Sequence, residues 1–411
     1  MKKKSKIFYG WWIVAGCFLL ALTGIGISIN CVSVFFKPVV ESLGFTRGDF
    51  SFYFTISALS MMLAAPFMGK ILTKYNIRVV MTICTILLTV SFLMYSRCTT
   101  LLQFYLCSVG VGIGSAGTHV IPVSLLLTNW FKKKRGLAFG IALSGSGIGG
   151  LIFNPLTNWI ITTYSWQNAY IVLGCILGIT TIPVALFIVT LHPSHKGLRA
   201  YGESEEDATS MENMPGLTLP EAVKTSGFWL LGLVLFITGL MNMGIQMHIP
   251  AYLTDVGYSS TFAANIVALF MGVLVVGKLT LGSICDRFGM RTGLIYVYGI
   301  FAVAALSMLG AHALWMVIFF GIIFGMANAI MTVPPPMMTA EVVGSKSYGV
   351  IYGVMNIFFT LGCAIGMPLS GYIYDSQGSY TLAWNLYAVL ALVGMVIALL
   401  ALARGRARLA A

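Results

Sequence analysis

The sequence predicts an all-α membrane protein with twelve transmembrane helices in two six-helix, pseudo-symmetric bundles. Three observations support this fold class. First, 58% of the 411 residues are hydrophobic and 9% are charged, whereas about a quarter of the residues in soluble domains are charged. Second, apolar stretches of about 20 residues recur along the chain, each long enough to cross a hydrocarbon core of about 30 Å. Third, the two halves of the chain repeat each other.

The expected spans are separated by short loops, with one long polar segment at 192–225 in the middle of the chain. That segment contains Glu203, Glu205, Glu206 and Asp207 among Ser, Gly and Pro. We therefore expect an N-terminal bundle at 1–191, a cytoplasmic linker at 192–225 and a C-terminal bundle at 226–411. The spans are expected at 10–36, 50–69, 78–96, 101–129, 137–161, 168–191, 226–250, 261–284, 292–310, 314–339, 349–373 and 381–403.

The repeat appears as one constant offset between the two halves. Gly69 to Arg78 aligns with Gly282 to Arg291, 213 positions later. The same offset relates Gly112, Pro122, Gly140 and Pro155 to Gly325, Pro335, Gly353 and Pro368. Parallel repeats of this kind predict two bundles related by a pseudo-two-fold axis along the membrane normal.

The distribution of basic residues predicts the orientation in the membrane. Of the 24 Lys and Arg, 20 lie on one side in the expected topology, including Lys2, Lys3, Lys4, Lys6, Lys132 and Lys346. Lys37, Arg47 and Arg97 lie on the other side, and Lys278 lies within a span. The positive-inside rule then places both termini in the cytoplasm of a multi-pass plasma (cytoplasmic) membrane protein. The short loops and tails favour a bacterial origin.

Composition and spacing argue against several other classes of protein. The net charge of +12 comes from basic residues in short loops, which is a topology signal and not a nucleic-acid-binding patch. The eight cysteines are scattered without metal-binding spacing, and no intramembrane Ser/His/Asp set or cofactor loop is present. We expect no metal, no cofactor and no enzymatic activity. The glycine-rich run 144–150 lacks the lysine of a phosphate loop, and we interpret it, like Gly362 and Gly366, as helix packing.

The loop between the eighth and ninth spans carries a recognisable motif. Gly282-x-x-x-Asp286-Arg287-x-Gly289-x-Arg291 resembles the loop signature of the major facilitator superfamily, and the first-half copy has Thr73 for the acidic residue and Asn76 for the glycine. The resemblance covers the whole chain. It implies conformational gating by the charged residues at these helix ends, which are Asp286, Arg287, Arg291, Lys74 and Arg78. The alternative is that the basic residues only determine topology.

A second motif narrows the resemblance. Residues 129–142, NWFKKKRGLAFGIA, are similar to the fifth-span motif of the monocarboxylate transporters and of the related oxalate/formate exchangers. In that branch the eighth span carries an arginine that receives the substrate carboxylate, and Lys278 occupies the matching place. Lys278 lies eight residues before Asp286, about 12 Å from the helix end and near the bilayer midplane.

A cation at that depth costs about 3 kcal/mol on insertion scales, which indicates a function. The alternatives are a lysine that extends to the interface or a neutral lysine bonded in the core. Two departures from the branch matter. Lysine cannot form the bidentate fork that arginine makes with a carboxylate, and Leu274 replaces the aspartate that takes part in proton coupling. The second cation of the oxalate/formate exchangers, in the eleventh span, is also missing here.

His119 in the fourth span is the other candidate for proton coupling, because histidine titrates near neutral pH; packing is the alternative. His119 could also donate a hydrogen bond to the substrate. Further substrate-binding candidates at similar depth are Asn328 and Asn356, although amides in spans commonly join neighbouring helices. Phe359 and Tyr53 are candidates for the apolar wall of the site. Pro334, Pro335 and Pro336 should interrupt the tenth span and provide a hinge.

Together these features predict a secondary active transporter that moves a small monocarboxylate, of the lactate or pyruvate type, with a proton by alternating access. The substrate would pair with Lys278, and the proton would bind Lys278 or His119. The partners expected are the carboxylate, the proton and the lipid bilayer, with no nucleic acid and no obligatory protein partner. One alternative is an organic anion exchanger of the oxalate/formate type without proton coupling. Another is a membrane sensor or receptor that does not transport.

Overall fold

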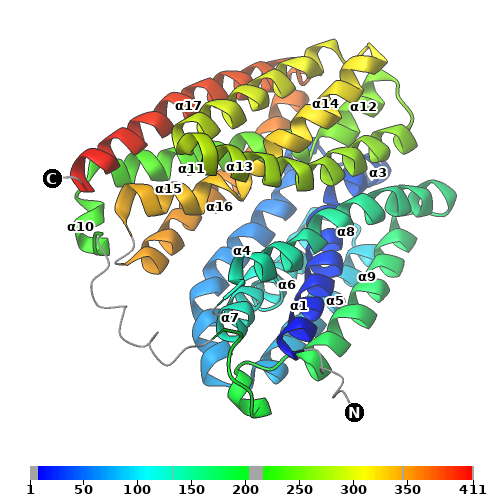
Figure 1. The fold of residues 1–411 in the computed structure, drawn as a ribbon. Helices are drawn as coiled ribbons and strands as arrows, with labels where there is room; N and C mark the ends of the chain where they lie inside the picture. Colours follow the sequence, from blue (N-terminus) through cyan, green and yellow to red (C-terminus); the bar gives the residue numbers. More distant parts are fainter. Residues whose placement is uncertain (1–7, 132, 203–215, 345–346, 410–411) are drawn as a thin grey trace, which may run out of the picture. The chain divides into compact units, whose positions relative to one another are not determined.

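The computed structural model describes residues 8–131, 133–202, 216–344 and 347–409, and apart from two isolated β-bridges their regular structure is helical (Figure 1). Several residues named above lie outside the described ranges. These are Lys2, Lys3, Lys4, Lys6, Lys132, Lys346 and the linker acids Glu203, Glu205, Glu206 and Asp207.

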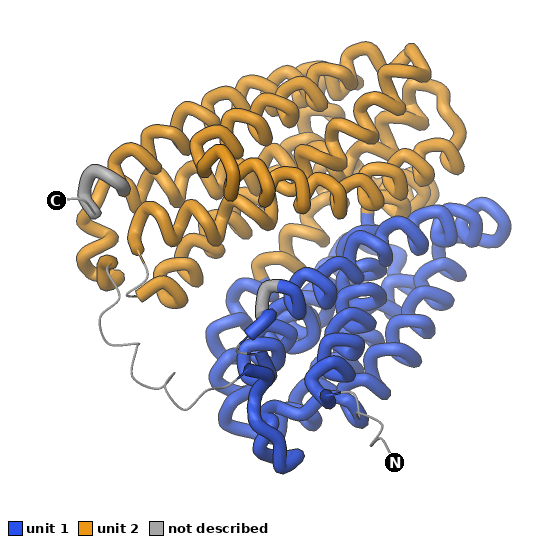
Figure 2. Tube along the Cα trace, in the orientation of Figure 1, with its two compact units in different colours: residues 1–32, 60–209 blue, residues 33–59, 210–411 orange. Residues whose placement is uncertain are grey.

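The chain divides into two compact units (Figure 2). Unit 1 contains residues 1–32 and 60–209, and unit 2 contains residues 33–59 and 210–411. The segment 33–59 therefore packs with the C-terminal part of the chain, although it precedes it in sequence by about 150 residues. The division of the chain into two six-helix domains at 1–191 and 226–411 stays a prediction.

Unit 1 is built from the helices of the first half. In chain order they are α1 (Gly10–Leu19), the π-helix η1 (Leu20–Ile25), α2 (Gly26–Ser28), the second part of α4 (Arg47–Lys74), α5 (Ile77–Met94), η2 (Tyr95–Arg97), α6 (Leu101–Ala116), α7 (Val120–Trp130), α8 (Arg135–Thr163), α9 (Trp166–Pro183), η3 (Val184–Ile188) and η4 (Pro193–Lys196).

Unit 2 contains α3 and the first part of α4 together with the helices of the second half. In chain order they are α3 (Val32–Leu43), α10 (Leu219–Val223), α11 (Ser226–Gln246), α12 (Ile249–Val256), α13 (Ser260–Ser307), η6 (Met308–Gly310), α14 (Leu314–Ala327), η7 (Asn328–Met331), α15 (Pro334–Val343), α16 (Tyr348–Gln377) and α17 (Thr381–Leu409).

Polar residues start several of these helices by binding the free backbone N–H groups of the first turn. Thr100 and Gln103 form a capping box at the start of α6. The side chains of Asn76, Ser165 and Ser259 accept hydrogen bonds from the backbone at the starts of α5, α9 and α13. The first N–H groups of a helix have no partner within it, and these side chains supply one.

Eleven described helical stretches are long and apolar enough to cross a membrane, and one of them, Ser260–Gly310, has 51 residues. That length is about 77 Å at 1.5 Å per residue, more than twice the thickness of a hydrocarbon core. It bends at Gly289, where φ is 83° and ψ is 160°. Glycine adopts this conformation without the steric cost that a side chain would add. Residues 260–310 therefore form two spans, and the predicted twelve-helix fold is confirmed.

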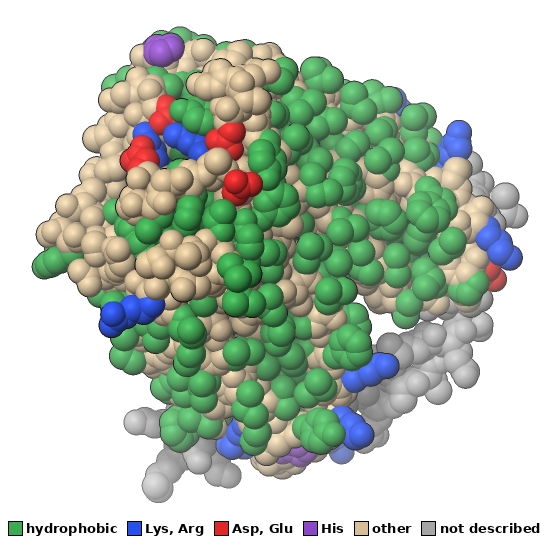
Figure 3. Space-filling model, turned by 180° about the vertical axis from the view of Figure 1, so that it is seen from behind, with side chains coloured by type: hydrophobic (Ala, Val, Ile, Leu, Met, Phe, Trp, Pro, Cys, Tyr) green, Lys and Arg blue, Asp and Glu red, His purple; other side chains and the backbone are tan. Residues whose placement is uncertain are grey.

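Hydrophobic side chains cover most of the molecular face drawn in Figure 3, as lipid contact requires. A compact patch on the same face brings Asp or Glu and Lys or Arg side chains together. On this face most of the Asp and Glu side chains lie in or beside this patch, whereas Lys and Arg also occur at separate places along the edges (Figure 3).

Small residues bring helices into close backbone contact in both units. A Cβ atom at Gly149 of α8 would lie 2.1 Å from the carbonyl oxygen of Leu22, and one at Gly366 of α16 would lie 2.1 Å from that of Leu240 in α11. A Cβ at Gly362 would lie 2.0 Å from the oxygen of Phe236. The glycine runs at 144–150 and 362–366 are therefore packing surfaces, as predicted.

Replacement of Gly362 by alanine should lower the free energy of unfolding by about 1–3 kcal/mol, because α11 and α16 must move apart to admit the methyl group. Thermal unfolding of the detergent-purified protein, followed by tryptophan fluorescence, measures this effect. Gly353 lies in the same helix with nothing within 4 Å of its Cβ position. Gly353→Ala is the matched control and should unfold at the same temperature or higher; equal losses in both variants would contradict the packing argument.

Candidate functional site

The fourth and tenth spans are interrupted at positions that correspond in the two repeats. α6 ends at Ala116 and α7 begins at Val120, while α14 ends at Ala327 and α15 begins at Pro334 after the short turn η7. The 213-residue offset maps His119, in the first break, onto Thr332, in the second. The break expected at Pro334–Pro336 is confirmed. Matched breaks in membrane helices indicate a binding site, because free backbone groups are tolerated only where they line a cavity or find partners.

His119 lies in the break of unit 1 and is buried, with 3% of its surface exposed. Neither Nδ1 nor Nε2 has a hydrogen-bond partner in the described part of the chain. The ring faces Gly24 in the π-helix η1, so closely that a Cβ there would lie 3.3 Å from Nε2. A buried polar group without a partner costs about 1–3 kcal/mol, and π-helices are frequent at functional sites. A role for His119 in binding a substrate or a proton stays a prediction.

Lys278 lies in α13 of unit 2, next to the residues of that helix that pack against α14. Gly277 packs against α14, where a Cβ would lie 2.7 Å from the Cα of Met326, and Leu274 is buried one turn earlier. Gly282, one turn later, has nothing within 4 Å of its Cβ position. Lys278 itself is half-buried. In the described ranges, no salt bridge or hydrogen bond involves its ammonium group.

Asn328 is already engaged by neighbouring amides. Its Oδ1 accepts a hydrogen bond of 2.9 Å from Asn242 Nδ2, and its Nδ2 donates one of 3.1 Å to Gln246 Oε1. All three side chains are buried. This ladder joins η7 to α11, so the structure gives Asn328 a role in connecting helices across the break of the tenth span.

The remaining substrate-binding candidates are all in unit 2, and they differ in how far they are exposed. Asn356 of α16 is exposed, and Phe359 is half-buried against the hydrophobic core. Tyr53 is buried and stacks on Phe50 with ring centroids 4.6 Å apart. Their roles in substrate binding stay predictions.

The charged residues of the loop motif are exposed and form no ion pair within the described residues. Asp286, Arg287 and Arg291 flank Gly289 at the end of the eighth span. In unit 1, Arg78 donates to the carbonyl oxygen of Val189 at 2.7 Å and to Thr190 Oγ1 at 3.0 Å. Lys74 and Arg78, with His192, His195 and Lys196, line a groove of about 570 Å³. Gating by the motif stays a prediction.

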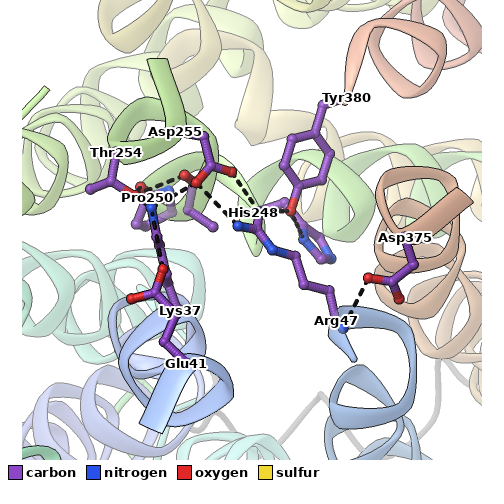
Figure 4. A network of polar contacts seen from close by, with 10 residues as sticks. Lys37, Glu41, Arg47, His248, Pro250, Thr254, Asp255, Asp375 and Tyr380 are labelled. Carbon is purple, nitrogen blue, oxygen red and sulfur yellow. Dashed lines mark hydrogen bonds and ion pairs between the residues drawn. The ribbon is translucent and has the colours of Figure 1, made fainter. Parts of the chain in front are cut away.

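Ion pairs occur instead in a group that sequence reasoning missed, which we name the Arg47 cluster (Figure 4). It comprises Lys37, Arg47, His248, Asp255 and Tyr380. Arg47 binds Asp255 with both terminal nitrogens, at 2.7 Å and 3.1 Å. Lys37 Nζ lies 2.6 Å from the same carboxylate. These bonds connect α3 and α4 to α12 within unit 2.

Further contacts hold Arg47 in place. Its guanidinium stacks on the ring of Tyr374, 3.7 Å from the centroid, and its side chain is 9% exposed. Asp375 of α16 accepts hydrogen bonds from the backbone N–H groups of Arg47 and Gly48, at 3.1 Å and 2.6 Å. This carboxylate caps the N-terminus of α4, where the helix dipole favours negative charge. Tyr380 in turn stacks on Trp384 of α17, with ring centroids 5.4 Å apart.

The cluster also sets the protonation of Asp255. Burial alone would raise the pKa of this carboxyl, but hydrogen bonds from Arg47 and Lys37 outweigh it and lower the pKa below 3.8. Asp255 therefore stays charged throughout the physiological range. The predicted spans leave Asp255 and Asp375 in the loops 251–260 and 374–380, on the same side of the membrane as Lys37 and Arg47. That shared side was the available signal for their pairing.

Replacement of Asn328 by alanine should destabilise the protein by about 1–2 kcal/mol, because it leaves the buried Asn242 and Gln246 amides without partners. The measurement is the midpoint of thermal unfolding in detergent. Asn356→Ala, at an exposed position in α16, is the control and should change the midpoint little. A stable Asn328→Ala protein that has lost substrate binding would instead assign Asn328 to the substrate site.

Comparison with known proteins places this architecture in a family. The model of the Major Facilitator Superfamily matches residues 16–280 and 231–410. Among curated proteins, the chain is 29% identical to Monocarboxylate transporter 12 of Mus musculus, over 92% of this chain and 82% of that protein. It is 23% identical to Monocarboxylate transporter 4 of Gallus gallus, over 90% of this chain and 78% of that protein.

Solved structures show the same fold at low sequence identity. A bacterial homologue of the human lysosomal transporter Spinster, in an inward-facing conformation, has a TM-score of 0.72 and 16% identity, with 99% of this chain and 98% of that chain covered. A mutant of the nucleoside transporter NupG has a TM-score of 0.75 and 11% identity, with 96% and 100% covered. With most of its residues matched by the family model, this multi-pass membrane protein belongs to the Major Facilitator Superfamily and is similar to monocarboxylate transporters.

Proposed function

We propose that the chain transports a small monocarboxylate of the lactate or pyruvate type together with a proton, and that Lys278 binds the substrate carboxylate. The observation that carries the proposal is the ammonium group of Lys278, half-buried in an apolar helix and without an ion-pair partner in the described residues. The similarity to proteins named monocarboxylate transporters supports the substrate class.

The physical argument concerns the cost of a charge at mid-membrane. An ammonium group there costs about 3 kcal/mol. A bound carboxylate removes most of that cost, because the neutral pair is easier to enclose than either ion alone, provided that the remaining donors are also satisfied. The loaded transporter then reorients more readily than the empty one. This difference is what couples substrate binding to the change of conformation.

The carried proton requires a second group, since no Asp or Glu lies in the middle of a span of this chain. His119 fits this role because it is buried and both ring nitrogens lack partners among the described residues. It also lies in the break of the fourth span, and Asn328 lies in the corresponding break of the tenth. Lys278 is the alternative proton carrier if the lysine releases its proton with the substrate.

Uptake of labelled L-lactate into proteoliposomes tests the substrate assignment. With the interior alkaline, the native protein should accumulate lactate above equilibrium. Lys278→Ala should reduce saturable uptake by roughly a hundredfold or more, as expected when one partner of a buried ion pair is removed. Lys278→Arg is the matched control, because it keeps the charge and should retain a substantial part of the uptake. Normal affinity in Lys278→Ala would exclude this residue as the carboxylate site.

The same vesicles test the role of His119. His119→Asn should abolish accumulation driven by the pH gradient but keep exchange of external labelled lactate for internal lactate at equal pH, because exchange moves no net proton. His312 is exposed, and His312→Asn should behave like the native protein. Full gradient-driven accumulation in His119→Asn would assign the carried proton to Lys278 or to another group. Uptake that ignores pH but requires internal oxalate or formate would favour the anion exchanger.

A further inference from the structure

His248 is a buried histidine whose two hydrogen bonds determine which ring nitrogen carries the hydrogen in this structure. It lies at the start of α12 and is 0% exposed. Its Nδ1 lies 2.9 Å from Tyr380 Oη, and its Nε2 lies 2.9 Å from the carbonyl oxygen of Met367. A carbonyl oxygen only accepts, so Nε2 carries a hydrogen and donates it to Met367.

The direction of the other bond follows from Arg47. Arg47 Nη1 lies 2.8 Å from Tyr380 Oη, and a guanidinium group only donates. Tyr380 Oη therefore accepts from Arg47 and has its own hydrogen to donate, and the nearby acceptor is His248 Nδ1. With the hydrogen bonds of this structure in place, which we call the closed Arg47 cluster, His248 is thus neutral. Arg47 donates to Tyr380, and Tyr380 donates to Nδ1 of His248.

A proton on Nδ1 removes the acceptor of the hydrogen bond from Tyr380. Tyr380 Oη would then face N–H donors from both Arg47 and His248, while its own hydrogen would lose its acceptor. Two cations would also share one phenol oxygen in a buried place, which raises their electrostatic repulsion. This repulsion falls when Arg47 moves away from Tyr380. Such a movement also separates α4 from the start of α17.

We propose that His248 is a proton-binding site and that its protonation opens the Arg47 cluster. The ligand is a proton taken up from water at Nδ1, and its release restores the bond from Tyr380. In the orientation expected from the positive-inside rule, the cluster lies at the outer end of the helices. A low pH on the outer side of the membrane would then favour separation of α3 and α4 from α12 and α17. This inference goes beyond the proposed function, and it does not depend on which solute is carried.

The charged and titratable neighbours come from every element packed around His248. They are Lys37 and Glu41 from α3, Arg47 from α4, Tyr252 and Asp255 from α12, Tyr374 and Asp375 from α16, and Tyr380 before α17. The carboxylates are occupied, because Asp255 binds Arg47 and Lys37, and Asp375 binds the backbone of α4. Arg47 is the cation that reaches His248 through Tyr380.

The pH range of the opening distinguishes protonation of His248 from protonation of Asp255. The lowered pKa of Asp255 means that its contribution to the closed cluster is present above pH 3.8 and is lost only as the pH falls further. An opening that develops between pH 8 and pH 5.5 is outside that window. It lies instead in the range where a histidine that opening has exposed to water gains a proton.

A cysteine at position 51 can report the opening. Ser51 is fully buried in α4, one turn after Arg47, and its hydroxyl bonds only the Arg47 carbonyl oxygen, at 2.7 Å. Ser51→Cys is nearly isosteric. In a Cys175→Ser background, which removes the exposed native thiol, a membrane-impermeant maleimide is added to right-side-out vesicles at pH values from 8 to 5.5. The rate is corrected for the thiolate fraction with a surface cysteine, and no substrate is present.

The labelling rate at position 51 should rise by about tenfold or more as the pH falls. His248→Asn keeps an acceptor for Tyr380 but cannot gain a proton, so its labelling should be slow at every pH. Tyr380→Phe removes the bonds from Arg47 and to His248, and should shift the midpoint to higher pH. Asp255→Asn should label rapidly throughout, because the ion pairs are lost.

His312→Asn, at an exposed position, is the matched control and should keep the pH dependence of the parent. A second untitratable variant, His248→Gln, keeps a donor for the Met367 carbonyl and guards against a folding defect in His248→Asn. The proposal is overturned if the parent labels at a rate independent of pH, or if both His248 variants keep the parent's pH dependence. Because labelling needs no solute, failure of lactate transport would leave this inference standing.

Discussion

The bilayer interior cannot solvate charge, and this constraint explains where the charged residues of the chain occur. Each charge must lie at a helix end, be paired, or justify its cost by binding something. Asp286, Arg287 and Arg291 meet the first condition and are exposed beside the bend at Gly289. Arg47 and Asp255 meet the second, as an ion pair with two hydrogen bonds in which the arginine is buried. Lys278 has neither arrangement among the described residues, which is why it is the centre of the proposed function.

Features that depend on local pattern or on composition could be predicted from the sequence. The twelve spans follow from apolar length, and the break before Pro334 follows from the missing N–H of proline. The packing role of Gly362 and Gly366 follows from their four-residue spacing. In each case the physical cause acts within one helix or one turn, so that the neighbouring sequence contains the necessary information.

Features that depend on long-range contacts could not be predicted in the same way. The pairing of Arg47 with Asp255 joins residues 208 positions apart, and the contact of His248 with Met367 joins residues 119 apart. Periodicity says nothing about such pairs. Asn328 shows the same limit from the other side. Its hydrogen bonds to Asn242 and Gln246, 86 and 82 positions away, could not be read from its depth in the membrane.

The stacking of Trp384 on Tyr380 gives the Arg47 cluster a built-in optical probe. The indole is buried, and its ring lies at 21° to the phenol ring. Indole emission responds to the electric field and the polarity around the ring. Any change in which atoms share the Tyr380 hydroxyl therefore alters the spectrum of a tryptophan that is already part of the native chain. In a variant whose other seven tryptophans are replaced, the state of this end of the helices can therefore be followed by fluorescence without an attached dye.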